Sequence, residues 1–181
     1  SLVKISIPSS VTKIGMFSFR NCKSLINISI PPSAISIGYN AFENCIKLTK
    51  IRLPDNIVSI ENDTFANCKS LTNIIIPSSV KSIGKYAFCG SNLTSISIPF
   101  SVTLIDTGVF KYCFQLLYVS IPSSVTSIGY NSFEGCKKLK EINLPDSINS
   151  IGADAFKKCQ SLQKIVFPSS ITSIERSAFE D

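Results

Sequence analysis

The chain repeats itself every 23 residues from one end to the other. Each unit follows the pattern L-x-x-I-x-I-P-x-x-V-x-x-I-G-x-x-A-F-x-x-C-x-x and leads directly into the next. One interval is shorter, with 22 residues from Leu71 to Leu93. A period of this length predicts a solenoid, in which each unit packs only on its neighbours, and hence a single repeat domain over residues 1–181. The eight units begin at Leu2, Leu25, Leu48, Leu71, Leu93, Leu116, Leu139 and Leu162.

Each unit contains the signals for a short strand and a return turn. The segment L-x-x-I-x-I alternates apolar and polar residues, which predicts a strand with one buried face. The following proline has no amide hydrogen and ends the strand, and the next two residues are mostly Ser-Ser, which suits a turn. The A-F-x-x-C segment has helical spacing over about one turn, so we expect a short helical or 3₁₀ turn. We expect a positive φ at the glycine that precedes it in five units: Gly15, Gly38, Gly84, Gly129 and Gly152.

Phenylalanine and cysteine recur at fixed positions of the unit. Stacked units would bring the phenylalanines into one continuous column in the core, since every unit has one. Six cysteines also share a position, and we expect them to be reduced, buried thiols, because a uniform row offers no obvious disulfide pairing. The two sets are Phe19, Phe42, Phe65, Phe88, Phe110, Phe133, Phe156 and Phe179, and Cys22, Cys45, Cys68, Cys113, Cys136 and Cys159.

Cys89 is the one cysteine outside this row. It lies in the shortened unit, where Ser91 occupies the usual cysteine position. One interpretation is an exposed thiol on a turn, available for an intermolecular disulfide or for modification. The other is a unit that lost a residue and kept its cysteine.

The sequence argues against an enzyme. It contains no histidine, which removes Ser-His and Cys-His nucleophilic pairs and nearly all catalytic zinc sites. No phosphate-binding glycine motif occurs. Carboxylates such as Glu43, Glu61, Asp63 and Glu134 are expected in turns, too hydrated for acid–base catalysis. We therefore predict no catalytic, cofactor-binding or metal-binding residues.

The charge indicates acidic partners. The net charge is +6, and lysines are frequent where one unit ends and the next begins. These positions should form a basic ridge, which would suit phosphate or sulfated glycan; the alternative is a hydrated rim that keeps the protein in solution. No nucleic-acid-binding motif accompanies the charge, so nucleic acid is not expected. No apolar run approaches the roughly 20 residues of a membrane span.

The repeat resembles a known class. Residues 116–138 read LLYVSIPSSVTSIGYNSFEGCKK, and this unit is similar to BspA-like leucine-rich repeats of surface proteins from parasitic protists and anaerobic bacteria. The resemblance covers the whole chain. It implies a right-handed solenoid of eight coils with a parallel sheet on its concave side, and adhesion to a host protein, matrix protein or glycan at the cell surface. The alternative is an intracellular scaffold or regulatory subunit, favoured by the cysteine row and by a start inside a repeat without an export signal.

A partner would contact the strand side chains that point outward. These form two columns, and most members are small or polar. Units 5 and 6 carry more apolar residues, which could anchor a partner. The alternative is that these residues pack locally around the shortened unit. The predicted protein-binding residues are Arg52, Ile75, Phe100, Phe114, Leu117, Tyr118, Asn143 and Val166. The end units lack polar caps, which predicts either a longer protein or a homo-oligomer formed through the ends.

Overall fold

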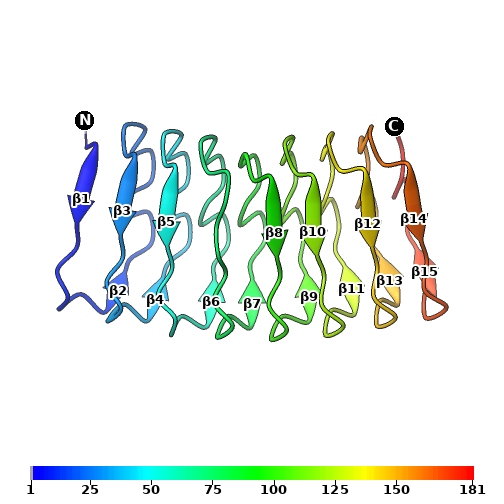
Figure 1. The fold of residues 1–181 in the computed structure, drawn as a ribbon, viewed down its shortest axis with the longest axis horizontal. Coiled ribbons are helices and arrows are strands. Elements are labelled where there is room, and N and C mark those ends of the chain that lie inside the picture. The colour runs from blue at the N-terminus through cyan, green and yellow to red at the C-terminus, as the bar shows by residue number, and fades with distance from the viewer. Residues whose placement is uncertain (1) are drawn as a thin grey trace.

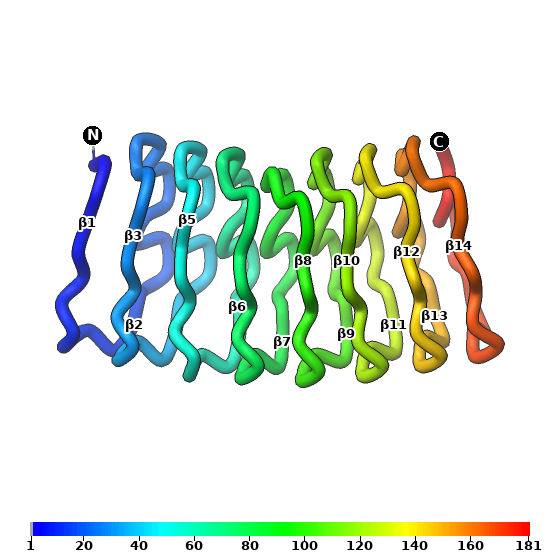
Figure 2. The backbone as a smooth tube through the Cα atoms, viewed as in Figure 1, coloured from blue at the N-terminus to red at the C-terminus, as the bar shows by residue number. Residues whose placement is uncertain are grey.

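The computed structural model describes residues 2–181 as a right-handed parallel β-solenoid. Each unit runs down one side of the molecule as an extended segment, passes through a turn, and returns along the opposite side (Figure 1). Successive turns follow nearly the same path and advance steadily from the N-terminus to the C-terminus (Figure 2). Because each turn lies beside the next, residues 23 positions apart in the sequence become neighbours.

Two sets of strands build the solenoid. We call the side that carries the first set the strand face. The first set comprises β1 (Lys4–Ser6), β3 (Asn27–Ser29), β5 (Lys50–Arg52), β8 (Ser95–Ser97), β10 (Tyr118–Ser120), β12 (Glu141–Asn143) and β14 (Lys164–Val166). The second set is shorter and comprises β2 (Lys13–Ile14), β4 (Ser36–Ile37), β6 (Ser59–Ile60), β7 (Ser82–Ile83), β9 (Leu104–Ile105), β11 (Ser127–Ile128), β13 (Ser150–Ile151) and β15 (Ser173–Ile174).

All paired strands are parallel, and equivalent positions of the repeat face each other. In β1, β3 and β5, for example, Ile5 lies beside Ile28 and Ile28 beside Ile51. On the strand face the pairing is interrupted, giving separate sheets β1-β3-β5, β8-β10 and β12-β14. Residues 73–75 of unit 4 occupy the place of a strand but form none.

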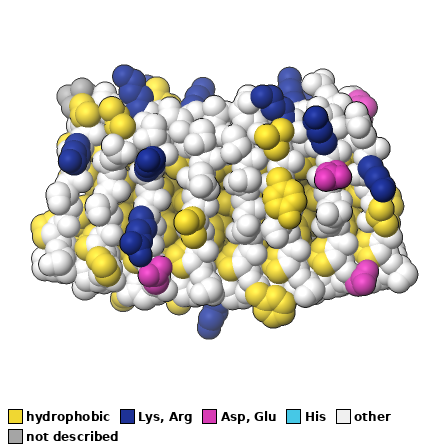
Figure 3. Space-filling view, in the orientation of Figure 1, with side chains coloured by type: hydrophobic (Ala, Val, Ile, Leu, Met, Phe, Trp, Pro, Cys, Tyr) yellow, Lys and Arg dark blue, Asp and Glu magenta, His cyan; other side chains and the backbone are white. Residues whose placement is uncertain are grey.

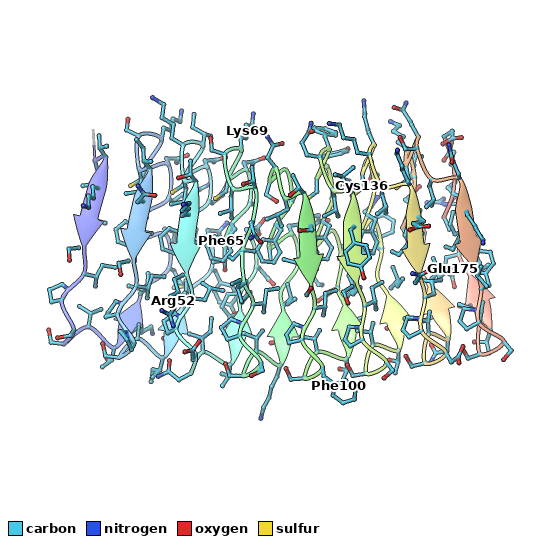
Figure 4. The ribbon with its side chains drawn as sticks, in the orientation of Figure 1. Arg52, Phe65, Lys69, Phe100, Cys136 and Glu175 are labelled. Carbon is cyan, nitrogen blue, oxygen red and sulfur yellow. The ribbon has the colours of Figure 1, made fainter. Side chains whose placement is uncertain are left out.

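The phenylalanine column predicted from the period is confirmed. From Phe19 to Phe179 each ring stacks on the next, with ring centroids 5.3 to 5.8 Å apart. The rings from Phe42 to Phe156 are fully buried, and Phe65 lies inside the solenoid in the third unit (Figure 4). From the second unit to the seventh, the leucine at the start of the unit and the isoleucines of both strand sets fill the rest of the core, whereas Leu2 and Ile174 in the end units are exposed.

The A-F-x-x-C segment forms hydrogen-bonded turns, and the expected helical turn is wrong: the part of the chain that the structure describes contains no helix. Two positions explain this. The residue two places before each phenylalanine of the column has a positive φ, as in Tyr86 (57°). From Phe19 to Phe156 the residue two places after it also has one, as in Tyr112 (58°). Only three residues remain between them, and a right-handed helix cannot continue through a positive φ.

The predicted positive φ at the recurring glycines is also wrong, because none of these five has one. Three glycines with a positive φ, Gly90, Gly108 and Gly135, lie elsewhere in the unit. The recurring glycine instead allows close approach of the preceding unit. A Cβ at Gly129 would lie 2.7 Å from the backbone oxygen of Ile105.

The cysteines are free thiols, as predicted. Each thiol of the row from the second unit on donates a hydrogen bond to a phenylalanine carbonyl of the preceding unit, as Cys136 Sγ does to Phe110 O at 3.2 Å. Burial raises the pKa of the Cys113 thiol to about 12. The row therefore consists of neutral, hydrogen-bonded thiols that are part of the core.

Candidate interaction surface

The strand face presents two columns of exposed side chains, since alternate residues of each strand point away from the core. Five predicted binding residues lie on these columns: Arg52, Ile75, Tyr118, Asn143 and Val166. Most other members are serine, asparagine or lysine, so exposed apolar side chains are scattered among polar ones (Figure 3). Ile75 is the most exposed of the large apolar residues, at 79%.

A hollow of about 610 Å³ lies between units 3 and 4 on this face. Its walls include Lys50 and Arg52 of β5 and Asn73 and Ile75 of the unpaired segment. Arg52 also reaches Asp55 across 3.7 Å, with both side chains exposed. The hollow thus combines apolar residues, of which Ile75 is the exposed one, with two cations, and lies where the strand ladder is interrupted.

A second hollow, of about 580 Å³, spans units 6 to 8. It is lined by Leu117 and Tyr118 on one side and by Lys140, Glu141, Gln163 and Lys164 on the other. Glu141 of β12 lies beside Lys164 of β14. This second hollow lies where the strand pairing between β10 and β12 is interrupted.

The predicted apolar residues of units 5 and 6 do not form one patch. Phe100 is 71% exposed and lies on the lower edge, opposite the edge that carries Lys69 (Figure 4). Phe114 stacks on Tyr112, with centroids 5.8 Å apart, and the ammonium of Lys137 lies 5.5 Å from its ring centroid. Local packing therefore accounts for Phe114, whereas Leu117 and Tyr118 line the second hollow.

Glu134 was expected in a hydrated turn, but it is buried. Lys111 Nζ lies 2.7 Å from its Oε2, Tyr112 donates a hydrogen bond to its Oε1 at 3.0 Å, and Asn131 donates a further one. Burial acts to lower the pKa of Lys111, but the hydrogen bond and charge of Glu134 outweigh it and raise the pKa. The hydrogen bond to Glu134 also raises the pKa of Tyr112.

This network belongs to a column of charges that the sequence analysis missed. The charge of the residue that follows the column phenylalanine alternates in sign between several neighbouring units. Ion pairs join Arg20 to Glu43, Lys111 to Glu134 and Lys157 to Glu180, at 2.6, 2.7 and 2.6 Å. A comparison of the residues at this position in successive units would have identified all three pairs, because the two partners of each pair are one period apart in the sequence. With its lysine, tyrosine and asparagine partners, Glu134 stabilises the fold.

Cys89 occupies the same column, between Ala66 and Lys111. It is half-buried, so part of its surface remains exposed. Burial raises its pKa to about 11, against the opposing effect of Lys111, so the group is a neutral thiol at physiological pH. Ser91 takes the place of the missing cysteine in the row and lies 3.4 Å from Cys113 Sγ.

Within residues 2–181, histidine, cysteine and carboxylate side chains do not gather into any group suited to hold a metal ion.

No helix among the described residues is long and apolar enough to cross a membrane.

Comparison with known proteins decides the family. A model of the BspA type leucine rich repeat region, in six copies, matches residues 1–117 and 105–181. The chain belongs to this family. The BspA-type repeat is a scaffold for protein interaction, which agrees with a surface of shallow hollows. No protein of curated function matches this BspA-type chain.

Solved structures of bacterial leucine-rich-repeat proteins share the fold. One from Bacteroides ovatus is 37% identical with a TM-score of 0.92, over 95% of this chain and 47% of its own. One from T. pallidum is 31% identical with a TM-score of 0.81, over 89% of this chain and 78% of its own. The BspA-type chain thus spans about half the length of the Bacteroides protein.

Proposed function

We propose that this chain is a non-catalytic interaction module that binds a protein partner across its strand face. The observation that carries the proposal is the hollow of about 610 Å³ beside Ile75, at the point where the strand ladder is interrupted. Elsewhere most outward side chains of the strand face are serine, asparagine or lysine. The hollow provides the concave site that a projecting side chain of a partner needs.

Ile75 and Arg52 would supply the central contacts. An apolar side chain that is 79% exposed gains the most from desolvation by a partner, and arginine is common among residues that dominate interface energies. Lys50 and Asn73 provide a polar rim. Tyr118, Asn143 and Val166 extend the same face toward the C-terminus, so a large partner would contact several units at once.

We further propose that the module is of the adhesion type and acts at the cell surface, on a host or matrix protein or glycan. Membership in the BspA-type family supports this. The second candidate is an intracellular scaffold, favoured by seven free cysteines. Labelling intact cells with a membrane-impermeant reagent separates the two, since absence of label would contradict the surface role. Association between copies is an additional expectation, and light scattering that shows a monomer over a wide concentration range would contradict it.

The site itself is tested by a pull-down with three forms of the protein. Ile75→Asp introduces a charge into the hollow and should abolish capture of a partner that the unmodified chain retains. Phe100→Ser is the matched control, because Phe100 is equally prominent but lies on the lower edge. Capture that survives Ile75→Asp and fails with Phe100→Ser would contradict the assignment of the strand face.

A further inference from the structure

One long edge of the solenoid carries a row of lysines. Along this edge each unit passes from its turns back to the strand face, through residues 23–26, 46–49, 69–72, 92–94, 114–117, 137–140 and 160–163. These residues include no aspartate, glutamate or arginine. We call the six lysines among them the lysine edge: Lys23, Lys47, Lys69, Lys137, Lys138 and Lys140.

The charge of the lysine edge is uncompensated. All six side chains are exposed, and within residues 2–181 none of them takes part in an ion pair. Glu43 binds Arg20 and Glu134 binds Lys111, whereas Glu141, which follows Lys140, lies on the strand face beside Lys164. Like charges gathered in this way raise the local potential and attract anions.

The edge also has a linear geometry. Parallel strands lie about 4.8 Å apart, so lysines of neighbouring units follow one another at roughly that interval along the solenoid. Lys23, Lys47 and Lys69 come from three successive unit boundaries, and Lys137, Lys138 and Lys140 cluster at a later one. Figure 3 shows dark blue side chains along the upper edge, with a magenta side chain at its right end.

We propose that the lysine edge binds a linear sulfated polysaccharide, independently of the partner on the strand face. A row of cations with regular spacing matches a polymer that carries anionic groups along its length. All six are lysines, whose ammonium groups act as point charges and favour many weak contacts over bidentate recognition of one group.

Other polyanions fit the edge less well. Single-stranded nucleic acid would need several free aromatic faces in a row for its bases. Tyr112 and Phe114 stack on each other, and Tyr118, which lines a hollow with Lys140, offers a single ring. A duplex is usually entered by a helix, and the described residues contain none. A membrane surface would be bound more tightly through a continuous apolar face beside the cations. The exposed apolar side chains of this edge, Ile26, Phe114 and Leu117, are instead separated by unit boundaries whose exposed residues are lysine and threonine.

Heparin is the probe for the test. The full chain should bind heparin at physiological salt more tightly than desulfated heparin, an oligothymidylate or vesicles containing phosphatidylserine. Replacing Lys137, Lys138 and Lys140 together by glutamine should weaken heparin binding about tenfold or more, because three counterion-releasing contacts are lost. The slope of log affinity against log salt should become shallower by about 2 to 3 for the same reason.

The control removes the same charge elsewhere. Lys13, Lys81 and Lys85 are exposed, lie outside the edge and form no ion pair in the described part of the chain, and their replacement by glutamine should leave heparin affinity within about twofold. Equal losses for the two triple variants would overturn the proposal, since net charge alone would then explain binding. Oligothymidylate or vesicles bound as tightly as heparin would overturn the polysaccharide assignment. Thermal unfolding checks that both variants are folded.

Discussion

At the scale of single residues, Gly129 tests why glycine recurs at this position. It is needed either for the close approach of neighbouring units or for its conformational freedom. A Cβ there would lie 2.7 Å from Ile105 O, so Gly129→Ala must push two units apart. We expect a loss of about 1 to 3 kcal/mol in the free energy of unfolding, the usual cost of overpacking. Urea denaturation measures it.

Gly15 is the matched control, because it holds the same repeat position but a Cβ there would meet only Ser18 Oγ, at 3.2 Å. Gly15→Ala should be neutral or slightly stabilising, since it restricts the unfolded chain. If the two alanine variants lose the same stability, the close-approach explanation is wrong.

Glu134 makes a second prediction at this scale. Glu134→Gln keeps a group of the same size but removes the charge that faces Lys111. We expect a loss of roughly 2 kcal/mol, because a partly buried ammonium loses its partner while the hydrogen bond from Tyr112 can persist. Glu43→Gln is the comparison: its partner Arg20 is more exposed, and the loss should stay below about 1 kcal/mol. A larger loss at Glu43 would contradict this ranking.

At the scale of elements, the unpaired segment 73–75 should be the least protected part of the strand face. The amides of Asn73, Ile74 and Ile75 donate no backbone hydrogen bond within the described residues, although the side chain of Ile74 is buried. Amides without a hydrogen bond exchange fastest, because no part of the structure has to open first. Hydrogen–deuterium exchange should therefore be at least about tenfold faster, on average, over residues 73–75 than over residues 118–120 of β10. Equal protection would show that the ladder is continuous in solution.

The cysteine row makes the stability depend on pH. Burial raises the pKa of the Cys113 thiol from 9.0 to about 12, so the folded protein holds this proton more tightly than the unfolded chain. This contribution is complete below pH 9 and is lost as the pH rises toward 12. The free energy of unfolding should fall over this window, and Cys113→Ala should make the fall shallower by up to about 1.4 kcal/mol per pH unit. An unchanged slope in the variant would exclude a role for this thiol.

The elements also show what the sequence could predict. The period alone places equal positions side by side, so the phenylalanine column, the cysteine row and the exposed strand columns followed from it. The turns did not, because the positions with positive φ hold Phe17, Tyr112 and Lys158 in some units, beside the asparagine, aspartate and glycine of most others, which tolerate this conformation. The interruption at residues 73–75 was not predicted either, since their side chains keep the normal strand alternation. The hollow beside Ile75 could therefore be located only in three dimensions.

At the scale of the whole molecule, the phenylalanine column should couple the units along the solenoid. In a repeat protein, stability is the sum of unit terms and nearest-neighbour terms, so a defect in the middle costs more than one at an end. Phe65 is fully buried and stacks on two rings at 5.6 Å, whereas Phe179 stacks on the ring before it and is 37% exposed.

Phe65→Ala should therefore lower the free energy of unfolding by about 3 to 5 kcal/mol, and Phe179→Ala by less than half of that. Phe65→Ala should also broaden the urea transition, because the units on either side of the gap lose part of their coupling and begin to unfold separately. Circular dichroism records both effects. A transition that shifts without broadening would mean that the strand ladders and the leucine and isoleucine core couple the units without help from the rings.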